Sequence, residues 1–104
     1  MAQIATWTFA ADGNGAWADI TTNLPFQFIS QGTWGSGTMT FQFSVDGGTT
    51  AINIMDEDTG VLVSLSANGT TGSLGGSTGT LVRPVLTGSS SPSLTVYANQ
   101  VVVR

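Results

Sequence analysis

An alternation of apolar and polar side chains over residues 38–45 constrains the fold of this chain more than any other feature. Met39, Phe41, Phe43 and Val45 occupy every second position, and threonine, glutamine or serine fills the positions between them. A period of two is typical of a β-strand that buries one face and exposes the other. We therefore expect the other strands to pack on the face that these four side chains form.

The residues that follow this strand predict a β-hairpin at the centre of the chain. The sequence Asp46-Gly47-Gly48 supplies residues that tolerate a positive φ, as a tight reversal between two strands requires. Ile52 and Ile54 then alternate with polar or small residues. This second run is expected to pair with the first.

Further short strands are predicted on both sides of this hairpin. Turn residues separate them at intervals of roughly ten residues, and β-branched residues are frequent between the turns. We expect these strands at residues 3–10, 16–20, 26–30, 61–65 and 81–87. Residues 93–98 and 101–103 are expected to form one last long strand or two strands joined at Asn99. Because proline cannot donate a hydrogen bond within a sheet, Pro84 predicts that its strand is an edge strand or a bulged one.

Four turn or loop segments separate the predicted strands. Residues 12–15 (Asp-Gly-Asn-Gly) and 56–60 (Asp-Glu-Asp-Thr-Gly) have the composition of turns. Residues 31–37 are predicted as a glycine-rich loop around Trp34. Residues 67–80 consist mostly of glycine, serine and threonine, which favours a mobile loop over a short hairpin.

These patterns together predict an all-β protein. No window places apolar residues at helical spacing, and neither an internal repeat nor a linker divides the chain. We expect one domain over residues 1–104, an antiparallel β-sandwich of immunoglobulin-like or jelly-roll-like type with about seven to nine strands.

The charge composition excludes some function classes. The net charge is −4, and the only basic residues are Arg83 and Arg104, too few to neutralise the phosphates of a nucleic acid. The acidity also argues against binding to anionic membranes. Only 8% of the residues are charged, so hydroxyl groups and glycine backbone cover much of the surface. Such a surface repels other subunits weakly and favours assembly.

Targeting signals and reactive residues are equally sparse. The chain contains no cysteine, no apolar run long enough to span a membrane and no secretory pattern at Met1, so we expect synthesis in a cytoplasm. It also lacks histidine and lysine, which leaves carboxylates and Tyr97 for acid–base chemistry. We expect no catalysis and no cofactor.

The acidic residues allow two alternatives to a passive role. Asp12 or Asp19 together with Asp46 could form the carboxylate pair of a small hydrolase, although nothing in the sequence places them together. The run Asp56-Glu57-Asp58 could bind a cation such as Ca²⁺, but three adjacent acids are more often a solvated turn. We therefore predict no metal site and leave the cation question at this run open.

Two tryptophans are the candidate interface residues. Trp7 and most phenylalanines lie at alternating strand positions, where aromatic side chains usually fill the core. Trp17 follows a turn and Trp34 lies in a glycine-rich loop, so these two are the better candidates for a subunit or partner contact. Core packing remains the alternative for both.

Three segments carry a resemblance to a known family. GTWGSGTMTFQFSVDGGTTAINI (32–54), NLPFQFISQGTW (23–34) and GTLVRPVLTGSSSPSLTV (79–96) resemble a recurring pattern in small structural proteins of tailed bacteriophages. In that pattern the first segment forms the central hairpin, and an aromatic residue often follows the Gly-Gly-Thr-Thr turn. Ala51 occupies this position here, which is a departure from the pattern.

The resemblance implies a virion component, most simply a capsid decoration or cement protein. Proteins of this kind commonly act as trimers on the outer surface of the shell, so the implied partners are further copies of the chain and the major capsid protein. The exposed N-terminal segment, Trp17 and Trp34 are the expected contact points. The alternative is a carbohydrate- or host-surface-binding module of a tail or head fibre, which would require exposed tryptophans.

Overall fold

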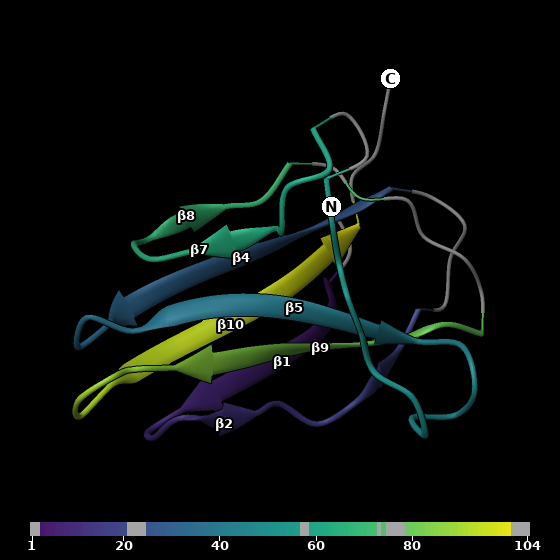
Figure 1. The fold of residues 1–104 in the computed structure, drawn as a ribbon. Coiled ribbons are helices and arrows are strands. Elements are labelled where there is room, and N and C mark those ends of the chain that lie inside the picture. Colours follow the sequence, from purple (N-terminus) through teal and green to yellow (C-terminus); the bar gives the residue numbers. More distant parts are fainter. Residues whose placement is uncertain (1–2, 21–24, 57–58, 73, 75–78, 101–104) are drawn as a thin grey trace.

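The long strands form two antiparallel sheets that pack face to face (Figure 1). This arrangement is seen in a computed structural model that describes residues 3–20, 25–56, 59–72, 74 and 79–100. Sheet A has the order β1 (Gln3–Phe9), β10 (Ser93–Gln100), β4 (Phe26–Thr33), β8 (Gly69–Thr70). The prediction of an all-β sandwich is confirmed, and the two sheets form a single compact domain.

Sheet B has two long strands at its centre and short strands at its edges. The central strands are β9 (Leu81–Thr87) and β5 (Thr38–Ser44), which pair along their whole length. Two-residue strands border them: β2 (Gly13–Asn14) and β3 (Ala18–Asp19) on β9, and β6 (Ile52–Asn53) and β7 (Ser64–Leu65) on β5.

The core lies between the sheets and follows the predicted alternation. Met39 and Phe41 of β5 are fully buried, as are the alternating apolar residues of β4, β9 and β10. The Phe41 ring stacks on that of Phe28 with centroids 4.2 Å apart, and Phe26 meets Phe28 edge-on at 5.5 Å. Aromatic stacking of this kind adds to the gain from burying the rings.

The predicted central hairpin is present, but its connection is longer than a tight turn. Gln42 and Phe43 pair with Asn53 and Ile52, and residues 45–51 join the two strands. Gly47 and Gly48 have φ values of 75° and 93°, so the predicted positive-φ positions are correct. The prediction that Val45 is covered by other strands is wrong: its side chain is 70% exposed.

Several element boundaries differ from the prediction. Strand β4 continues through Thr33, so the predicted loop over 31–37 is reduced to its second half. The predicted turn at 12–15 contains β2, the strand predicted over 61–65 contains only β7, and 16–20 contains only β3. The predicted strand at 101–103 lies outside the described residues.

The prediction of a mobile loop over residues 67–80 is wrong for its described part. Strand β8 pairs there with Ile29 and Ser30, and Phe26 and Leu74 exchange backbone hydrogen bonds of 2.7 and 2.9 Å. The Thr71 hydroxyl accepts a further bond from the Phe28 N–H at 3.1 Å. A threonine side chain thus replaces a backbone carbonyl at the edge of sheet A.

Pro84 lies in an interior strand, so the edge alternative of the prediction is wrong. An irregularity lies beside it, where residues 15–17 face only residues 83–84 of β9. The missing N–H of Pro84 does not interrupt pairing with β5, where this residue lies opposite Phe41. The Pro84 carbonyl instead accepts a hydrogen bond from Gly15 on the other side, at 2.8 Å. Because the N and O atoms of one strand residue point to the same side, the irregularity falls between β2 and β3.

The two ends of the sandwich differ. At one end, which we call the turn end, the chain crosses between the sheets four times, through residues 10–12, 34–37, 66–68 and 88–92 (Figure 1, left). At the opposite end, which we call the cavity end, the 45–51 loop and a small hairpin around the Met55–Leu62 bridge border an opening between the sheets.

Candidate interaction surfaces

Trp17 is half-buried on the outer face of sheet B rather than exposed. The guanidinium carbon of Arg83 lies 4.2 Å from the centroid of its ring, a distance at which a cation and an aromatic face attract. Its indole also lies close to Gly48, where an added Cβ atom would come within 2.9 Å of Trp17 Nε1. The ring is therefore covered by the protein itself.

Arg83 extends this contact into a strip across sheet B. Its Nε donates to Gln42 Oε1 at 2.9 Å, and Gln42 Nε2 donates to Asn53 Oδ1 at 3.2 Å. We call Trp17, Arg83, Gln42 and Asn53 the Trp17 strip. These side chains hold one another in fixed positions, and tryptophan and arginine are enriched in protein interfaces.

Trp34 is also half-buried, at the turn end and away from the Trp17 strip. Its Nε1 donates to Asn68 Oδ1 at 2.9 Å, and the same oxygen accepts from the Gly32 N–H at 2.9 Å. Part of its ring packs against the core. The structure thus gives Trp34 a role in joining two turns, and it does not bring the two candidate tryptophans together.

The outer face of sheet A is a second candidate surface. The strands β1, β10 and β4 lie side by side and contain no charged residue. Thr6, Tyr97 and Ile29 form one cross-strand row on this face. Thr8, Thr95 and Gln31 form the next row. The face offers hydroxyl and amide groups around an aromatic centre.

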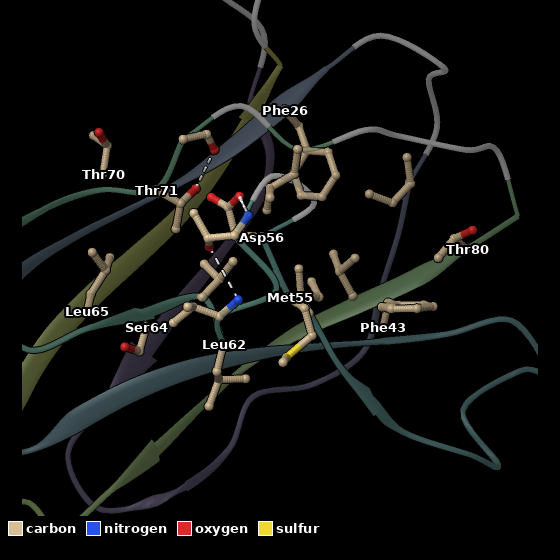
Figure 2. A pocket seen from close by; sticks show the side chains of 18 of the residues that line it. Phe26, Phe43, Met55, Asp56, Leu62, Ser64, Leu65, Thr70, Thr71 and Thr80 are labelled. Atoms are coloured by element: carbon tan, nitrogen blue, oxygen red, sulfur yellow. Dashed lines mark hydrogen bonds between the residues drawn. The ribbon is translucent and has the colours of Figure 1, made fainter.

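A cavity of about 670 Å³ opens between the sheets at the cavity end. Figure 2 shows side chains of both sheets converging on it, Phe26 of β4 and Phe43 of β5 among them. Its apolar lining residues are interspersed with polar ones, which are Asp56, Thr59, Ser64, Thr70, Thr71 and Thr80. Cavities of this size and composition are typical of binding sites.

The carboxylates proposed for a hydrolase are held at separate places. Asp12 lies at the turn end, where it accepts hydrogen bonds from the Gly88 N–H and from the N–H and hydroxyl of Ser89. These bonds, the Ser89 hydroxyl first, lower the pKa of the Asp12 carboxyl. Asp12 thus joins the turn that follows β1 to the 88–92 turn through hydrogen bonds.

Asp46 has a comparable role in the 45–51 loop. Its carboxylate accepts from the Thr50 N–H at 2.8 Å and from the Ser44 hydroxyl at 2.7 Å. The hydrogen bonds to Thr50 contribute most to lowering the pKa of Asp46 from 3.8 to about 2. Asp19 lies on β3, outside the 45–51 loop that holds Asp46.

The acidic run at 56–58 is only partly described. Asp56 Oδ1 accepts from the Thr59 N–H at 3.2 Å, as in a turn, and Glu57 and Asp58 lie outside the described residues. Within the described ranges, no group of three or more histidine, cysteine, aspartate or glutamate side chains could hold a metal ion. The same ranges contain no helix long and apolar enough to cross a membrane.

Sequence reasoning missed the two side chains that join turns, Asp12 and Asn68. Their only sequence signal was the preference of aspartate and asparagine for turn positions, which does not identify a distant partner. The charge-free strands β1, β4 and β10 could have been found by counting charges strand by strand. Comparison of the chain with protein-family models, with curated proteins and with solved structures found no match.

Proposed function

We propose that this protein is a bacteriophage virion structural protein that decorates the capsid and stabilises the shell. The observation that supports this proposal best is the charge-free outer face of sheet A, formed by β1, β10 and β4. Neutral hydroxyl and amide groups can hydrogen-bond to a partner without the desolvation cost that buried charges carry. The face therefore suits a permanent contact with the major capsid protein.

The Trp17 strip is the surface that we assign to contacts between copies of the chain. Its tryptophan and arginine are already fixed by mutual contacts, so little side-chain entropy remains to be lost when a second copy binds. A homotrimer on the shell, as the resemblance implies, would present several sheet A faces at once. Multivalent binding then strengthens attachment beyond what one face provides.

The alternative of a carbohydrate- or host-surface-binding module has less support. Sugar stacking needs an open aromatic face, whereas Arg83 lies over the Trp17 ring and Asn68 accepts the indole N–H of Trp34. Neither tryptophan is among the residues that line the cavity between the sheets. These contacts favour the assembly proposal.

The experiment compares particles that carry the protein with particles that lack it. Adding the purified protein to depleted particles should restore bound copies and raise the temperature at which the shells break. The double variant Thr8→Lys/Gln31→Lys places two charges on the sheet A face and should abolish binding. The matched variant Thr38→Lys/Thr87→Lys places them on sheet B, where the two threonines are paired, and should bind normally. Shells that neither bind the protein nor change in stability would refute the proposal.

A further inference from the structure

The Trp17 strip is a single cross-strand row on the outer face of sheet B. Arg83 lies opposite Gln42 in the pairing of β9 with β5, and Gln42 lies opposite Asn53 in the pairing of β5 with β6. Trp17, which comes just before β3, continues the row on the other side of β9, with its ring against the Arg83 guanidinium. The row therefore runs across the sheet from the β3 edge to the β6 edge.

Arg83 is held in this row with part of its hydrogen-bonding capacity unused. A guanidinium group has N–H donors on three nitrogens in one planar fork. The Nε atom donates to Gln42 Oε1 at 2.9 Å, and the face of the group lies against Trp17. The two terminal nitrogens make no hydrogen bond with the residues that the structure describes. Because the fork is already oriented, it suits a carboxylate, which it can bind through two parallel hydrogen bonds.

An exposed carboxylate lies on the same face, one strand away. Ala18 and Ile20 pack into the core, so the alternation along the chain directs Asp19 outward between them. Asp19 lies opposite Leu81, two positions before Arg83 on β9. Such diagonal neighbours are roughly 7–8 Å apart. Within the described ranges no ion pair joins the two side chains, so the face presents one charge of each sign.

The other carboxylates that the structure describes are engaged in turns. Asp12 and Asp46 accept hydrogen bonds from the backbone of two turns, and Asp56 accepts one within its own turn. The chain has a net charge of −4, so two copies repel each other weakly at most orientations. Arg83 is the basic side chain of the described residues, and Asp19 is the carboxylate that shares its face. A contact between two such faces brings opposite charges together.

We propose that Arg83 of one copy pairs with Asp19 of a second copy when the outer faces of their B sheets meet. Because both charges lie on one face, each copy supplies a guanidinium and a carboxylate to the contact, as self-association of one surface requires. The exposed part of Trp17 is then covered between the copies. This inference rests on the proposed assignment of the Trp17 strip to contacts between copies, and it names the residue that the arginine binds.

Sedimentation velocity over a range of protein concentrations tests the pairing. The original protein should self-associate. Asp19→Lys and Arg83→Glu should each raise the dissociation constant by at least about tenfold, because like charges then face each other. The double variant Asp19→Lys/Arg83→Glu should restore association. A mixture of the two single variants should also associate more tightly than either alone, because each copy supplies the charge that the other lacks.

A variant of sheet A is the matched control. Thr8→Lys/Gln31→Lys changes the net charge by the same amount as Asp19→Lys does, and it should associate like the original protein. Thermal unfolding shows whether Arg83→Glu, which loses its contact with Trp17, remains folded. Asp19→Lys changes an exposed side chain and carries the test by itself if Arg83→Glu unfolds.

The results for association and for shell binding separate this proposal from the proposed function. Asp19→Lys should still bind depleted shells through sheet A, whereas Thr8→Lys/Gln31→Lys should associate without binding them. An original protein that stays monomeric, an Asp19→Lys variant that associates normally, or a folded double variant that fails to recover would overturn the pairing. Failure of the original protein to bind shells, with association intact, would refute the role at the capsid and leave the pairing in place.

Discussion

The turn end and the cavity end close the same sandwich in different ways. At the turn end, Asp12 bonds to the 88–92 turn, and Asn68 bonds to Gly32 and Trp34. The Ser90 N–H also donates to the Gly35 carbonyl at 2.9 Å. At the cavity end, the same strands leave an opening of about 670 Å³ between the sheets.

The two ends of the sandwich differ in how much apolar surface they leave uncovered. Polar side chains at the turn end satisfy the backbone of turns that lie far apart in the sequence, so little apolar surface is left uncovered there. At the cavity end the inward face of β5 continues past its cover, from Phe41 through Phe43 to Val45. We infer that hydrogen bonds between turns close the turn end, whereas the cavity end leaves apolar surface uncovered.

Substitutions along β5 should show the largest effect. Phe41 is fully buried and stacked on Phe28, so Phe41→Ala should lower the free energy of unfolding by roughly 3–5 kcal/mol. Phe43 lies two residues closer to the cavity end and is only half-buried, so Phe43→Ala should cost about 1–2 kcal/mol. Urea unfolding of both variants measures the two losses in free energy of unfolding. Equal losses would show that Phe43 is buried as effectively as Phe41.

A pair of glycines provides the next comparison. Gly35 and Gly47 both have positive φ, at 57° and 75°, so alanine is strained at either position. A Cβ atom at Gly35 would collide with the Ser90 carbonyl oxygen, whereas one at Gly47 meets nothing within 4 Å. Gly47→Ala should cost about 1 kcal/mol. Gly35→Ala should cost roughly 2–4 kcal/mol, because the clash adds to the same strain. Thermal unfolding measures both losses, and a Gly47→Ala loss as large as that of Gly35→Ala would contradict the difference.

The alternation in β5 predicted the fold and the direction of the core correctly, but not where the core ends. Val45 follows the same period as Met39 and Phe41, yet nothing in that period states how far the opposite sheet extends. For Pro84, the sequence left an edge strand and a bulged strand open for a related reason. Its strand position was clear, but the side that its missing N–H faces depends on the neighbouring strand.

The candidate site was harder to predict than the fold. Turn composition marked Trp17 and Trp34 as near loops, but their burial depends on Arg83 and Asn68, which are distant in the sequence. The cavity is formed by elements on both sheets, and pairing between such segments is not encoded in any local pattern. Contacts between residues distant in the sequence therefore determine both the burial of the two tryptophans and the formation of the cavity.

Removal of single hydrogen bonds should lower the free energy of unfolding by smaller amounts, and these amounts should also differ between sites. Asn68→Ala removes the acceptor for both Gly32 and Trp34, and we expect it to cost about 1–2 kcal/mol. Asn53→Ala, in the Trp17 strip, removes one exposed bond to Gln42 and should cost about 0.5 kcal/mol or less. Trp34→Phe keeps an aromatic ring but removes the N–H and part of the packed indole, so it should cost at least half of the Asn68→Ala loss. A Trp34→Phe variant with unchanged stability would show that the hydrogen bond between Trp34 and Asn68 does not stabilise the fold.

Acid should lower the stability of the folded state through two carboxylates, one at each end of the sandwich. Asp12 at the turn end and Asp46 near the cavity end both have a pKa below the value of 3.8 that an unfolded chain would show, and for Asp46 it is about 2. Between these values the unfolded state binds more protons than the folded state does, so stability falls as pH falls. The contribution of Asp46 is complete above about pH 4 and is lost as the pH approaches about 2.

The midpoint of thermal unfolding between pH 6 and pH 2 measures this loss. Asp46→Asn and Asp12→Asn should each flatten the decline below pH 4, because asparagine keeps an acceptor oxygen but has no charge to lose. The double variant should be flattest, since the two sites share no hydrogen-bond partner and their effects should add. A double variant that declines as steeply as the original protein would mean that neither carboxylate links the folded state to pH.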